Sequence, residues 1–437
     1  MRVPTFRIAT LGCKANQYDS QRLAEALTAL GFHEAGDSAP PSVLVINTCT
    51  VTQAADRKSR QLASRALREH PGSRVFVTGC YATAQPEALR GMDGVSGVFG
   101  RQEWNEMLEA VAGASLPEAV RLRGDFGIAG FRGRTRALLK VQEGCDFGCA
   151  YCVVPRVRGR PRSRPLSDVL SEARRLLDCG FREIVLTGIH LGLYGRDMGE
   201  GVELADAVEQ VASLPGLGRL RLSSLEAPEL SERLLRAMKH PAVCAHLHLP
   251  LQSGDDGVLS RMKRRYTAGE FLATVDAARA HLDRPAITGD VIVGFPGETH
   301  DDFENTLRTC QDVGFTRLHV FPFSPRPGTV AAKLGGTVQM AVVRERCARL
   351  KDLADALAVQ WARSFVGQRE RALLEDARLG GELVGYTDRY VRLSVRCDAK
   401  HLGELREVMC IRAWGQSLVG ELIAEGSSAE ARRDEVV

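Results

Sequence analysis

The residues most able to do chemistry in this chain are three cysteines, Cys145, Cys149 and Cys152, which stand in KVQEGCDFGCAYCVVP with the spacing C-x3-C-x2-C. Thiolates ligate zinc and iron–sulfur clusters, and three so close together can wrap one small inorganic centre. A structural zinc requires a fourth ligand, and the next histidine is the distant His190. Three thiolates on a four-iron cluster leave one iron open, as chelation of S-adenosylmethionine (SAM) requires. The alternatives are a distorted zinc knuckle and a Cys149–Cys152 redox pair, which leaves Cys145 without a role.

A second set of cysteines is spread over the first part of the chain. Cys13, Cys49 and Cys80 each follow a short β-rich run, and Gly12 and Gly79 directly precede two of them. Ligand sites in parallel α/β sheets gather at the carboxyl ends of the strands, so these three thiols can meet at one point. The alternative for each is a small buried core residue. The other cysteines have no ligand spacing and are expected to be core residues: Cys179, Cys244, Cys310, Cys347, Cys397 and Cys410.

Basic residues are concentrated just after the first cysteine motif. The segment RVRGRPRSR contains Arg156, Arg158, Arg160, Arg162 and Arg164. Its place beside the cysteine loop predicts contacts to RNA phosphates that steer the RNA to the reactive centre. The alternative is a solvated basic loop. The run RMKRR at 261–265 extends this predicted surface. Three aromatic residues are candidates for stacking on bases or, equally, for core positions: Tyr386, Tyr390 and Trp414.

The elements that must position these residues follow from the hydrophobic pattern. Up to about residue 115, short β-rich runs alternate with helical patterns, which predicts βαβ units and a parallel sheet. From residue 137 the same alternation resumes with six further units, which predicts an open or partial (β/α)6 barrel, because a closed eight-unit barrel usually takes about 250 residues. The strand candidates are 6–11, 43–47, 74–79, 95–100, 137–142, 183–187, 219–223, 245–250, 286–294 and 316–323.

The texture of the sequence changes again near residue 369. Close-set β-rich runs leave no room for crossover helices, which predicts a small antiparallel β-barrel. The expected fold class is therefore α/β: an N-terminal parallel α/β domain, a central partial (β/α)6 barrel and a C-terminal antiparallel barrel. The expected boundaries are an N-terminal domain at 1–120, a basic linker at 121–136, a central domain at 137–366, a terminal barrel at 367–428 and a flexible tail at 429–437.

Composition excludes several classes of protein. The 437 residues are 44% hydrophobic and 26% charged, as in an ordinary globular chain with real cores. The net charge of +4 is small for this length and does not by itself indicate nucleic acid. No stretch approaches the roughly 20 apolar residues of a membrane span, and the N-terminus has no signal-peptide run. We therefore expect a cytoplasmic protein without membrane contact, in which the 12 cysteines indicate metal chemistry rather than disulfides.

With Tyr151 as the aromatic residue, C-x3-C-x-aromatic-C resembles the signature of radical SAM enzymes. From about residue 6 to residue 425, the chain resembles the methylthiotransferases of that superfamily, which carry two 4Fe–4S clusters. The cysteine triad that begins at Cys13 matches their auxiliary cluster, and the triad that begins at Cys145 matches their SAM cluster. The resemblance also implies that the terminal barrel is a TRAM domain, which binds RNA in many members.

The resemblance implies a SAM site at the carboxyl ends of the central strands, where barrel enzymes bind substrates. The turn of Thr187 and Gly188 is expected to face the methionyl amine, and polar groups after the third and fifth strands to meet the ribose and adenine. His246 and His248 share one face of a strand, where a hydrogen-bonded interior role competes with a ligand role. The candidate SAM contacts are Tyr151, Thr187, Gly188, Ser223, Ser224, Glu226, Gln252, Asp290 and Gly294.

Several stretches are similar to the branch of the family that modifies threonylcarbamoyladenosine in tRNA, among them LGCKANQYDS, LTGIHLGLYGRD and FSPRPGT. This similarity implies insertion of a methylthio group at carbon 2 of that adenosine, next to the anticodon. One SAM donates the methyl group, and a second is cleaved to a 5′-deoxyadenosyl radical that abstracts hydrogen from the ring carbon. The implied partners are tRNA, an electron donor such as a flavodoxin or ferredoxin, and a sulfur source; we expect a monomer.

Three alternatives remain open at the level of sequence. Sister branches of the same family carry out this chemistry on isopentenyladenosine in tRNA or on a ribosomal protein. A rival of another class is a non-catalytic iron–sulfur protein that binds RNA. SAM cleavage by the reconstituted chain separates the enzymes from the binding protein.

Overall fold

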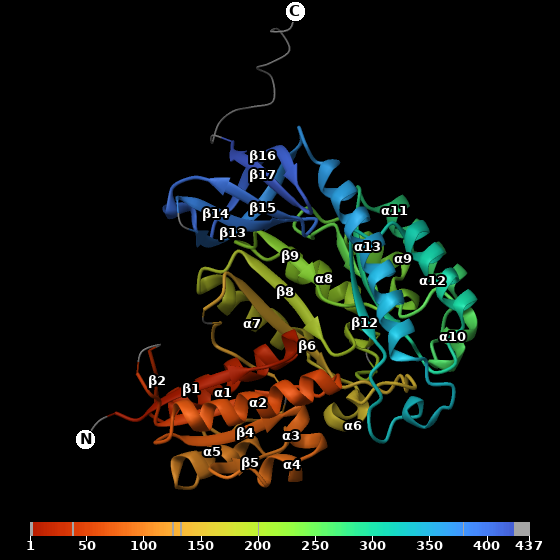
Figure 1. The fold of residues 1–437 in the computed structure, drawn as a ribbon. Coiled ribbons are helices and arrows are strands. Elements are labelled where there is room, and N and C mark those ends of the chain that lie inside the picture. The colour runs from red at the N-terminus through yellow and green to blue at the C-terminus, as the bar shows by residue number, and fades with distance from the viewer. Residues whose placement is uncertain are drawn as a thin grey trace, which may run out of the picture.

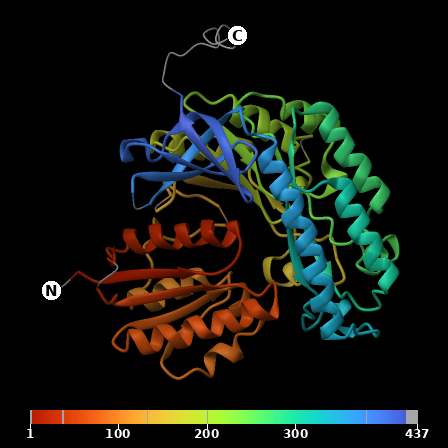
Figure 2. The ribbon, with the colours of Figure 1, turned by 45° about the horizontal axis from the view of Figure 1, so that its top comes forward.

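Three domains follow one another along the chain, and the first and third lie on the same side of the second (Figures 1 and 2). The computed structural model describes residues 3–423 except 37, 38, 125, 132, 200 and 379, so the expected tail at 429–437 lies outside the described residues. Among the residues that the structure describes, no helix combines the length and the apolar character needed to cross a membrane.

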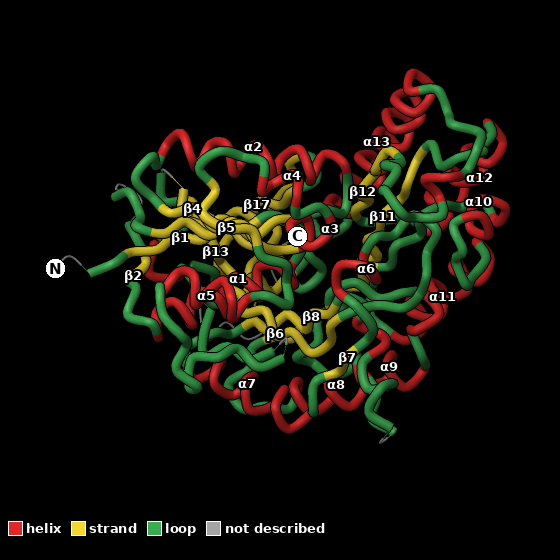
Figure 3. Tube along the Cα trace, turned by 90° about the horizontal axis from the view of Figure 1, so that it is seen from below, coloured by secondary structure: helices red, strands yellow, loops and turns green. Residues whose placement is uncertain are grey.

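The N-terminal domain is a five-stranded parallel sheet of order β2-β1-β3-β4-β5, as the βαβ alternation predicts. Its strands are β1 (Thr5–Thr10), β2 (His33–Glu34), β3 (Val43–Thr48), β4 (Arg74–Gly79) and β5 (Val95–Val98). Its helices are α1 (Lys14–Ala29), α2 (Gln53–Glu69), α3 (Cys80–Ala84), α4 (Glu87–Arg90) and α5 (Trp104–Ala112). Helices α1 and α5 cover one face of the sheet, and α2 and α4 cover the other (Figure 3). The apolar run at the start of β3 explains why both faces of the sheet are covered. Successive side chains of the strand point to opposite faces, so Val43 packs toward α1 and Leu44 packs toward α2.

The central domain is an open barrel of six parallel strands in sequence order, as predicted. Main-chain pairing joins the first three strands in one sheet and the last three in another, and the bridges Leu220↔Val243 and Ser224↔His248 connect the two. A short strand, β7 (Arg162–Ser163), runs antiparallel at the β6 edge. The six strands are β6 (Arg136–Glu143), β8 (Glu183–Gly188), β9 (Arg219–Leu222), β10 (His246–His248), β11 (Ala286–Val293) and β12 (Arg317–Pro322).

Helices cover the outer side of this barrel and share one large core with it. They are α7 (Leu166–Asp178), α8 (Leu204–Ala212), α9 (Glu232–Ala237), α10 (Asp256–Arg261), α11 (Ala268–His281), α12 (His300–Val313) and α13 (Met340–Arg363). Helix α6 (Val154–Arg158) packs instead against Cys80 at the start of α3. The long α13 links two domains, because Leu350 packs in the central core and Ala362 packs in the core of the terminal barrel.

The terminal domain is a closed barrel of order β13-β14-β15-β17-β16, in which β16 pairs back onto β13. Its strands are β13 (Arg369–Arg378), β14 (Glu382–Thr387), β15 (Arg392–Arg396), β16 (Leu405–Trp414) and β17 (Ser417–Leu422). The predicted antiparallel arrangement holds for every neighbouring pair except β15 and β17, which are parallel. The reason is topological, because strand direction cannot alternate all the way around a closed ring of five strands.

Candidate active site

Three cysteines meet at the carboxyl-terminal edge of the N-terminal sheet. Cys13 follows β1, Cys49 follows β3, and Cys80 opens α3 after β4. Because β1, β3 and β4 are neighbours in the sheet, the three side chains line one cavity. Burial raises the pKa of Cys49 to about 11, and the nearby Cys80 and Cys13 add to the rise. The structure thus places the triad that begins at Cys13 on one cavity, and we call this the auxiliary site.

Two glycines make this convergence possible. Gly12 has a φ of +107°, and a Cβ atom built there would lie 3.1 Å from the Sγ atom of Cys49. Gly79 has a φ of +96°, and a Cβ atom there would collide with the main chain of Thr48. A positive φ favours glycine, and the lack of space excludes any side chain. The Gly–Cys pairs noted in the sequence therefore set the backbone at the ends of β1 and β4, from which Cys13 and Cys80 line the cavity together with Cys49.

The triad that begins at Cys145 lies in the loop between β6 and α6, which we call the cysteine loop (residues 144–153). Its main chain is anchored from two directions, because Ala150 donates to the carbonyl of Met262 over 2.9 Å and accepts from Ala331 over 2.7 Å. Burial raises the pKa of Cys152 to about 12, and the nearby Cys149 and Cys145 add to the rise. The three cysteines therefore lie within eight residues of one anchored loop.

Each sulfur of the cysteine loop lies beside a hydrogen-bonding group. Main-chain N–H groups two residues further along the chain donate to Cys145 and Cys152, and the Arg264 guanidinium donates to Cys149, over 3.4 Å in each case. Arg264 in turn forms an ion pair with Glu226. Donors of this kind stabilise thiolates and tune iron–sulfur centres.

His190 is far from the cysteine loop in sequence but adjacent to it in the fold. Its Nδ1 atom lies 3.2 Å from the Sγ atom of Cys145, and its Nε2 atom lies 2.5 Å from the carboxylate of Glu229. Burial lowers the pKa of His190, but the hydrogen bonds to Cys145 and Glu229 outweigh burial and raise it to about 9. The distance of His190 along the sequence therefore gave a misleading picture, because the fold places it beside Cys145. Both of its ring nitrogens have partners within the protein, Cys145 and Glu229.

A cavity of ≈ 1310 Å³ lies between the three domains. The auxiliary site forms one part of its wall, the ends of the central strands another, and Tyr386 and Tyr390 of the terminal barrel a third. Val153, the last residue of the cysteine loop, and Val157 of α6 also line it. Small-molecule sites usually measure about 300–1,000 Å³, so this cavity has room for more than one ligand.

Five of the nine predicted SAM contacts line this cavity, namely Thr187, Gly188, Ser223, Ser224 and Asp290. Among the described residues, the buried hydroxyl of Ser223 has no hydrogen-bond partner. A buried polar atom without a partner is costly, so this hydroxyl fits contact with a polar ligand.

The other four predicted SAM contacts are not among the residues that line the cavity. The hydroxyl of Tyr151 and the carboxylate of Glu226 both face Arg264. The main chain of Gln252, with a φ of +65°, donates to the carbonyl of Asp290 over 2.8 Å. The N–H group of Gly294 is bound by the carboxylate of Glu298. These residues support the cysteine loop and β11, and their contact with SAM stays a prediction.

A polar array on β10, β11 and β12 adds a residue that sequence reasoning did not single out, His319. Asp290 accepts from His248 over 3.2 Å and from His319 over 3.0 Å. Burial raises the pKa of Asp290, but these two histidines outweigh burial and lower it. His246 and His248 both contact the hydroxyl of Thr288, and both also line the cavity, so the interior role and the ligand role weighed for them both stay predictions. The alternation in RLHVFP, like that in HLH, was the available signal for His319.

The basic run after the cysteine loop divides into buried and exposed arginines. Arg158 and Arg164 are each 5% exposed, and Arg164 pairs with Glu172 over 2.9 Å. The prediction that these two contact RNA is wrong, because ion pairs inside the protein enclose both guanidinium groups. Arg264, in the run at 261–265, is buried for the same reason. The exposed members stay predicted phosphate contacts: Arg156, Arg160 and Arg162.

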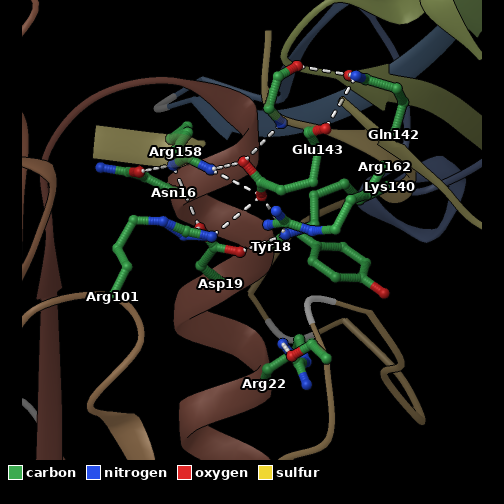
Figure 4. Close-up of polar contacts among 12 residues, drawn as sticks. Asn16, Tyr18, Asp19, Arg22, Arg101, Lys140, Gln142, Glu143, Arg158 and Arg162 are labelled. Atoms are coloured by element: carbon green, nitrogen blue, oxygen red, sulfur yellow. Dashed lines mark hydrogen bonds and ion pairs between the residues drawn. The ribbon is translucent and has the colours of Figure 1, made fainter. Parts of the chain in front are cut away.

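The buried Arg158 belongs to a cluster of five charges that joins the N-terminal domain to the central one (Figure 4). Its acids are Asp19 on α1 and Glu143 at the end of β6, which share the cations between them. All five side chains are at most 5% exposed. The cations are Arg101, Lys140 and Arg158.

The three aromatic candidates also differ in environment. The rings of Tyr386 and Tyr390 stack with centroids 5.0 Å apart, and the guanidinium group of Arg221 lies 4.7 Å from the Tyr390 ring. These two tyrosines therefore form part of the junction between the terminal barrel and the central domain. Trp414, at the end of β16, is 70% exposed and presents its ring to solvent.

The residues of both triads fit iron–sulfur clusters, and the strand ends fit SAM. Cys13, Cys49 and Cys80 line one cavity, the other triad lies within eight residues of one anchored loop, and positive-φ glycines shape the backbone at the auxiliary site. The donors around the cysteine loop and the Ser223 hydroxyl are the kinds of group that a cluster and a polar cofactor need.

Comparisons with known proteins agree with this geometry. Residues 139–310 match the Radical SAM superfamily, and residues 5–100 match Uncharacterized protein family UPF0004. The threonylcarbamoyladenosine tRNA methylthiotransferase MtaB of Bacillus subtilis is 36% identical over 425 residues, 94% of each chain. The tRNA-2-methylthio-N(6)-dimethylallyladenosine synthase of Geobacter metallireducens is 33% identical and covers 95% of this chain and 97% of its own.

Among solved structures, the radical SAM methyltransferase TsrM of Kitasatospora setae aligns with a TM-score of 0.54 at 15% identity, over 74% of this chain and 77% of its own. The open barrel and its cysteine loop thus define a radical SAM fold. The chain belongs to the radical SAM methylthiotransferase family, because relatives with that activity in their names align over nearly its whole length at more than 30% identity. It is therefore an enzyme that transfers a methylthio group.

Proposed function

We propose that this enzyme acts on tRNA and inserts a methylthio group at position 2 of threonylcarbamoyladenosine next to the anticodon, using two SAM molecules and two 4Fe–4S clusters. One observation carries the proposal: the auxiliary site, the predicted SAM-binding strand ends and the residues that follow the cysteine loop all line one cavity. A substrate base in that cavity would be within reach of both sites. Such a base would be splayed out of its loop, as in other sequence-specific RNA recognition.

The chain's own residues have distinct tasks in this proposal. When bound, a SAM cluster supplies the one-electron chemistry that makes an unactivated ring C–H bond reactive. The turn of Thr187 and Gly188 and the hydroxyl of Ser223 would orient SAM. The walls from three domains would exclude water and hold the base between the two sites.

The charge of the cavity favours the threonylcarbamoyl substrate over its dimethylallyl counterpart. The threonine part of threonylcarbamoyladenosine carries a carboxylate, whereas a dimethylallyl group is a hydrocarbon. Three exposed cations from separate segments line the cavity, Lys14, Arg134 and Arg317. Cationic side chains form strong charge-assisted hydrogen bonds with a carboxylate, and an apolar substituent would gain nothing from them.

Further partners are part of the proposal. The exposed arginines that follow the cysteine loop and the exposed ring of Trp414 would bind the tRNA outside the cavity, through phosphate contacts and stacking. An electron donor such as a flavodoxin or ferredoxin would reduce the SAM cluster, and a separate source would supply sulfur.

The test of the substrate is mass spectrometry of tRNA nucleosides from a strain that lacks the gene. We expect loss of 2-methylthio-threonylcarbamoyladenosine and accumulation of the unthiolated nucleoside. Loss of the 2-methylthio form of isopentenyladenosine instead would assign the enzyme to a sister branch. If the tRNA is unchanged and the ribosomal protein is unmodified in that strain, the enzyme belongs to the sister branch that acts on the ribosomal protein.

The test of catalysis is Cys152→Ala. After anaerobic reconstitution, the variant is expected to lose SAM cleavage and about half of its iron, because one of two four-iron clusters is gone. The auxiliary cluster should remain visible by electron paramagnetic resonance. A variant that still modifies tRNA would show that the cysteine loop is not the catalytic site, and a wild-type chain that cleaves no SAM would favour the RNA-binding protein.

A further inference from the structure

The helix that leaves the cysteine loop packs directly on the auxiliary site. Helix α6 begins two residues after Cys152, and its Val157 shares a small apolar cluster with Val153 and Cys80. Cys80 is the first residue of α3 in the other domain. The two predicted cluster sites are therefore joined by one helix-to-helix contact.

The last residue of this helix, Arg158, lies against the auxiliary site itself. Its Nη2 atom hydrogen-bonds the side-chain oxygen of Asn16, and the sulfur of Cys80 lies 3.8 Å from that same oxygen. Arg158, Cys80 and Cys13 line the same cavity. Burial raises the pKa of the Cys80 thiol, and the charge of Arg158 and a hydrogen bond from it act in the opposite direction.

The guanidinium group of Arg158 is held rigidly in this position. Its Nη1 atom lies 2.9 Å from the carboxylate of Glu143, and its Nη2 atom lies 3.2 Å from that of Asp19 (Figure 4). The side chain is 2% exposed, so solvent screens its charge little. Glu143 lies two residues before Cys145, so Arg158 also ties together the two ends of the cysteine loop.

We propose that Arg158 is a positioning residue of the auxiliary site, whose fixed guanidinium group orients the Cys80 thiolate and raises the reduction potential of the cluster bound there. The inference rests on the auxiliary cluster of the proposed function and adds the residue that tunes it. A reduced cluster carries one more negative charge than an oxidised one, so a buried cation beside a ligand sulfur stabilises the reduced form. Hydrogen bonds to ligand sulfurs act in the same direction.

The experiment measures the midpoint potential of the auxiliary cluster in the full-length chain. Cys145, Cys149 and Cys152 are replaced by alanine throughout, so that the auxiliary cluster is the one paramagnetic centre. After anaerobic reconstitution, a reductive titration is followed by electron paramagnetic resonance. Arg158→Gln is expected to shift the midpoint to lower potential while the iron content stays that of one cluster.

The matched control is Lys140→Gln. Lys140 belongs to the same buried cluster, with its Nζ atom 2.6 Å from Asp19 and 3.0 Å from Glu143, so both variants lose one cation from one network. Only Arg158 of these two also faces Cys80, so Lys140→Gln is expected to lower the melting temperature but to leave the midpoint unchanged. An equal shift in both variants, or no shift in Arg158→Gln, overturns the inference.

A second pair of variants keeps every charge. Arg158→Lys cannot reach Asn16, Glu143 and Cys80 at once, and it is expected to shift the midpoint part of the way toward that of Arg158→Gln. Lys140→Arg is its control and should give no shift. If Arg158→Gln does not fold, this pair decides alone: equal midpoints in Arg158→Lys and Lys140→Arg overturn the inference. Failure of the triple-alanine chain to bind any cluster would instead overturn the auxiliary cluster of the proposed function.

Discussion

Burial raises the pKa of buried cysteines in this chain, and at the auxiliary site neighbouring thiols add to that rise. Cys49 and Cys310 are both buried, at 7% and 0% exposure. For Cys310, burial alone raises the pKa of the thiol, as expected for a core residue. For Cys49, Cys80 and Cys13 lie near enough to act on the pKa as well. Both residues are cysteines. Their environments differ because the backbone at the ends of β1, β3 and β4 places Cys49 near two other thiols.

Gly12→Ala is expected to abolish binding at the auxiliary site and to leave the SAM cluster in place. The new Cβ atom would press on the sulfur of Cys49, 3.1 Å away, in a backbone conformation with φ of +107°. Iron and sulfide analysis after reconstitution should show about half of the wild-type content, since one of two four-iron clusters is lost.

The matched control for this prediction is Gly31→Ala. Gly31 also has a positive φ, +85°, but nothing lies within 4 Å of a Cβ built there. Alanine there carries the backbone strain of a left-handed conformation, about 1–2 kcal/mol, without the collision. Full iron content in Gly12→Ala, or an equal loss in Gly31→Ala, would contradict the steric explanation.

Trp414→Ala is expected to weaken tRNA binding without changing stability. The side chain is 70% exposed, so its removal takes little apolar surface out of a core. Stacking of one base on an aromatic ring contributes about 1–3 kcal/mol, which corresponds to roughly a 5- to 150-fold loss of affinity. Filter binding at fixed salt measures the loss, and Trp414→Phe should restore most of it. Unchanged affinity in Trp414→Ala would place RNA on another face of the barrel.

At the scale of elements, sequence reasoning located strands well and lone side chains poorly. β4 spans Arg74–Gly79 as predicted, because an apolar run between turn residues is a local signal. The convergence of the cysteines was predictable as well, since parallel strands end at one edge. The burial of Arg158 was not, because its partners Asp19 and Glu143 belong to other elements and no spacing along the chain reveals them. β10 covers His246–His248 only, and Gln252 soon afterwards adopts a positive φ that no turn signal announced.

The junction between β9 and the terminal barrel depends on one buried carboxylate, Glu183. It pairs with Arg219 and Arg221, whose guanidinium groups also reach main-chain carbonyls of the barrel segment 386–388. Burial alone would raise the pKa of Glu183, but Arg221 and Arg219 outweigh it and lower the pKa to about 2. The ion pairs therefore contribute their full stability above the unfolded pKa, near 4.5, and lose it as the pH falls toward 2.

Glu183→Gln is expected to reduce the free energy of unfolding by about 3–5 kcal/mol at pH 7, because two buried guanidinium groups lose their shared carboxylate. The difference from wild type should narrow as the pH falls below 4.5. Urea unfolding at several pH values measures both effects. Glu232→Gln, which removes an exposed pair with Arg236, is the control and should change little. A pH-independent difference would show that the charge of Glu183 is not the cause.

At the scale of the whole molecule, charged junctions hold three domains around one cavity. The cluster of Asp19 and Glu143 joins the N-terminal domain to β6, and Glu183 joins the central strands to the terminal barrel. A third junction runs through Arg326, from the loop after β12, which pairs with Asp56 of α2 over 2.6 Å. The three large apolar cores lie almost wholly within single domains, so these polar contacts contribute much of what shapes the cavity between them.

Arg326→Met is expected to loosen the N-terminal domain from the central one. The guanidinium group is 2% exposed and also donates to Thr50, which directly follows Cys49. Removing it leaves Asp56 buried without its cation, at a cost of about 3–5 kcal/mol. The rate of hydrogen exchange should rise together at the start of α2 and in the loop at 323–329. Methylthio transfer should fall more than SAM cleavage, because the auxiliary site moves relative to the SAM site.

The control is Arg65→Met, which breaks an exposed ion pair with Glu69. It should lower the free energy of unfolding by less than about 0.5 kcal/mol and leave hydrogen exchange in both segments as slow as in wild type. If Arg326→Met reduces transfer and SAM cleavage to the same degree, the loop at 323–329 acts on the SAM site itself rather than on the distance between the two sites.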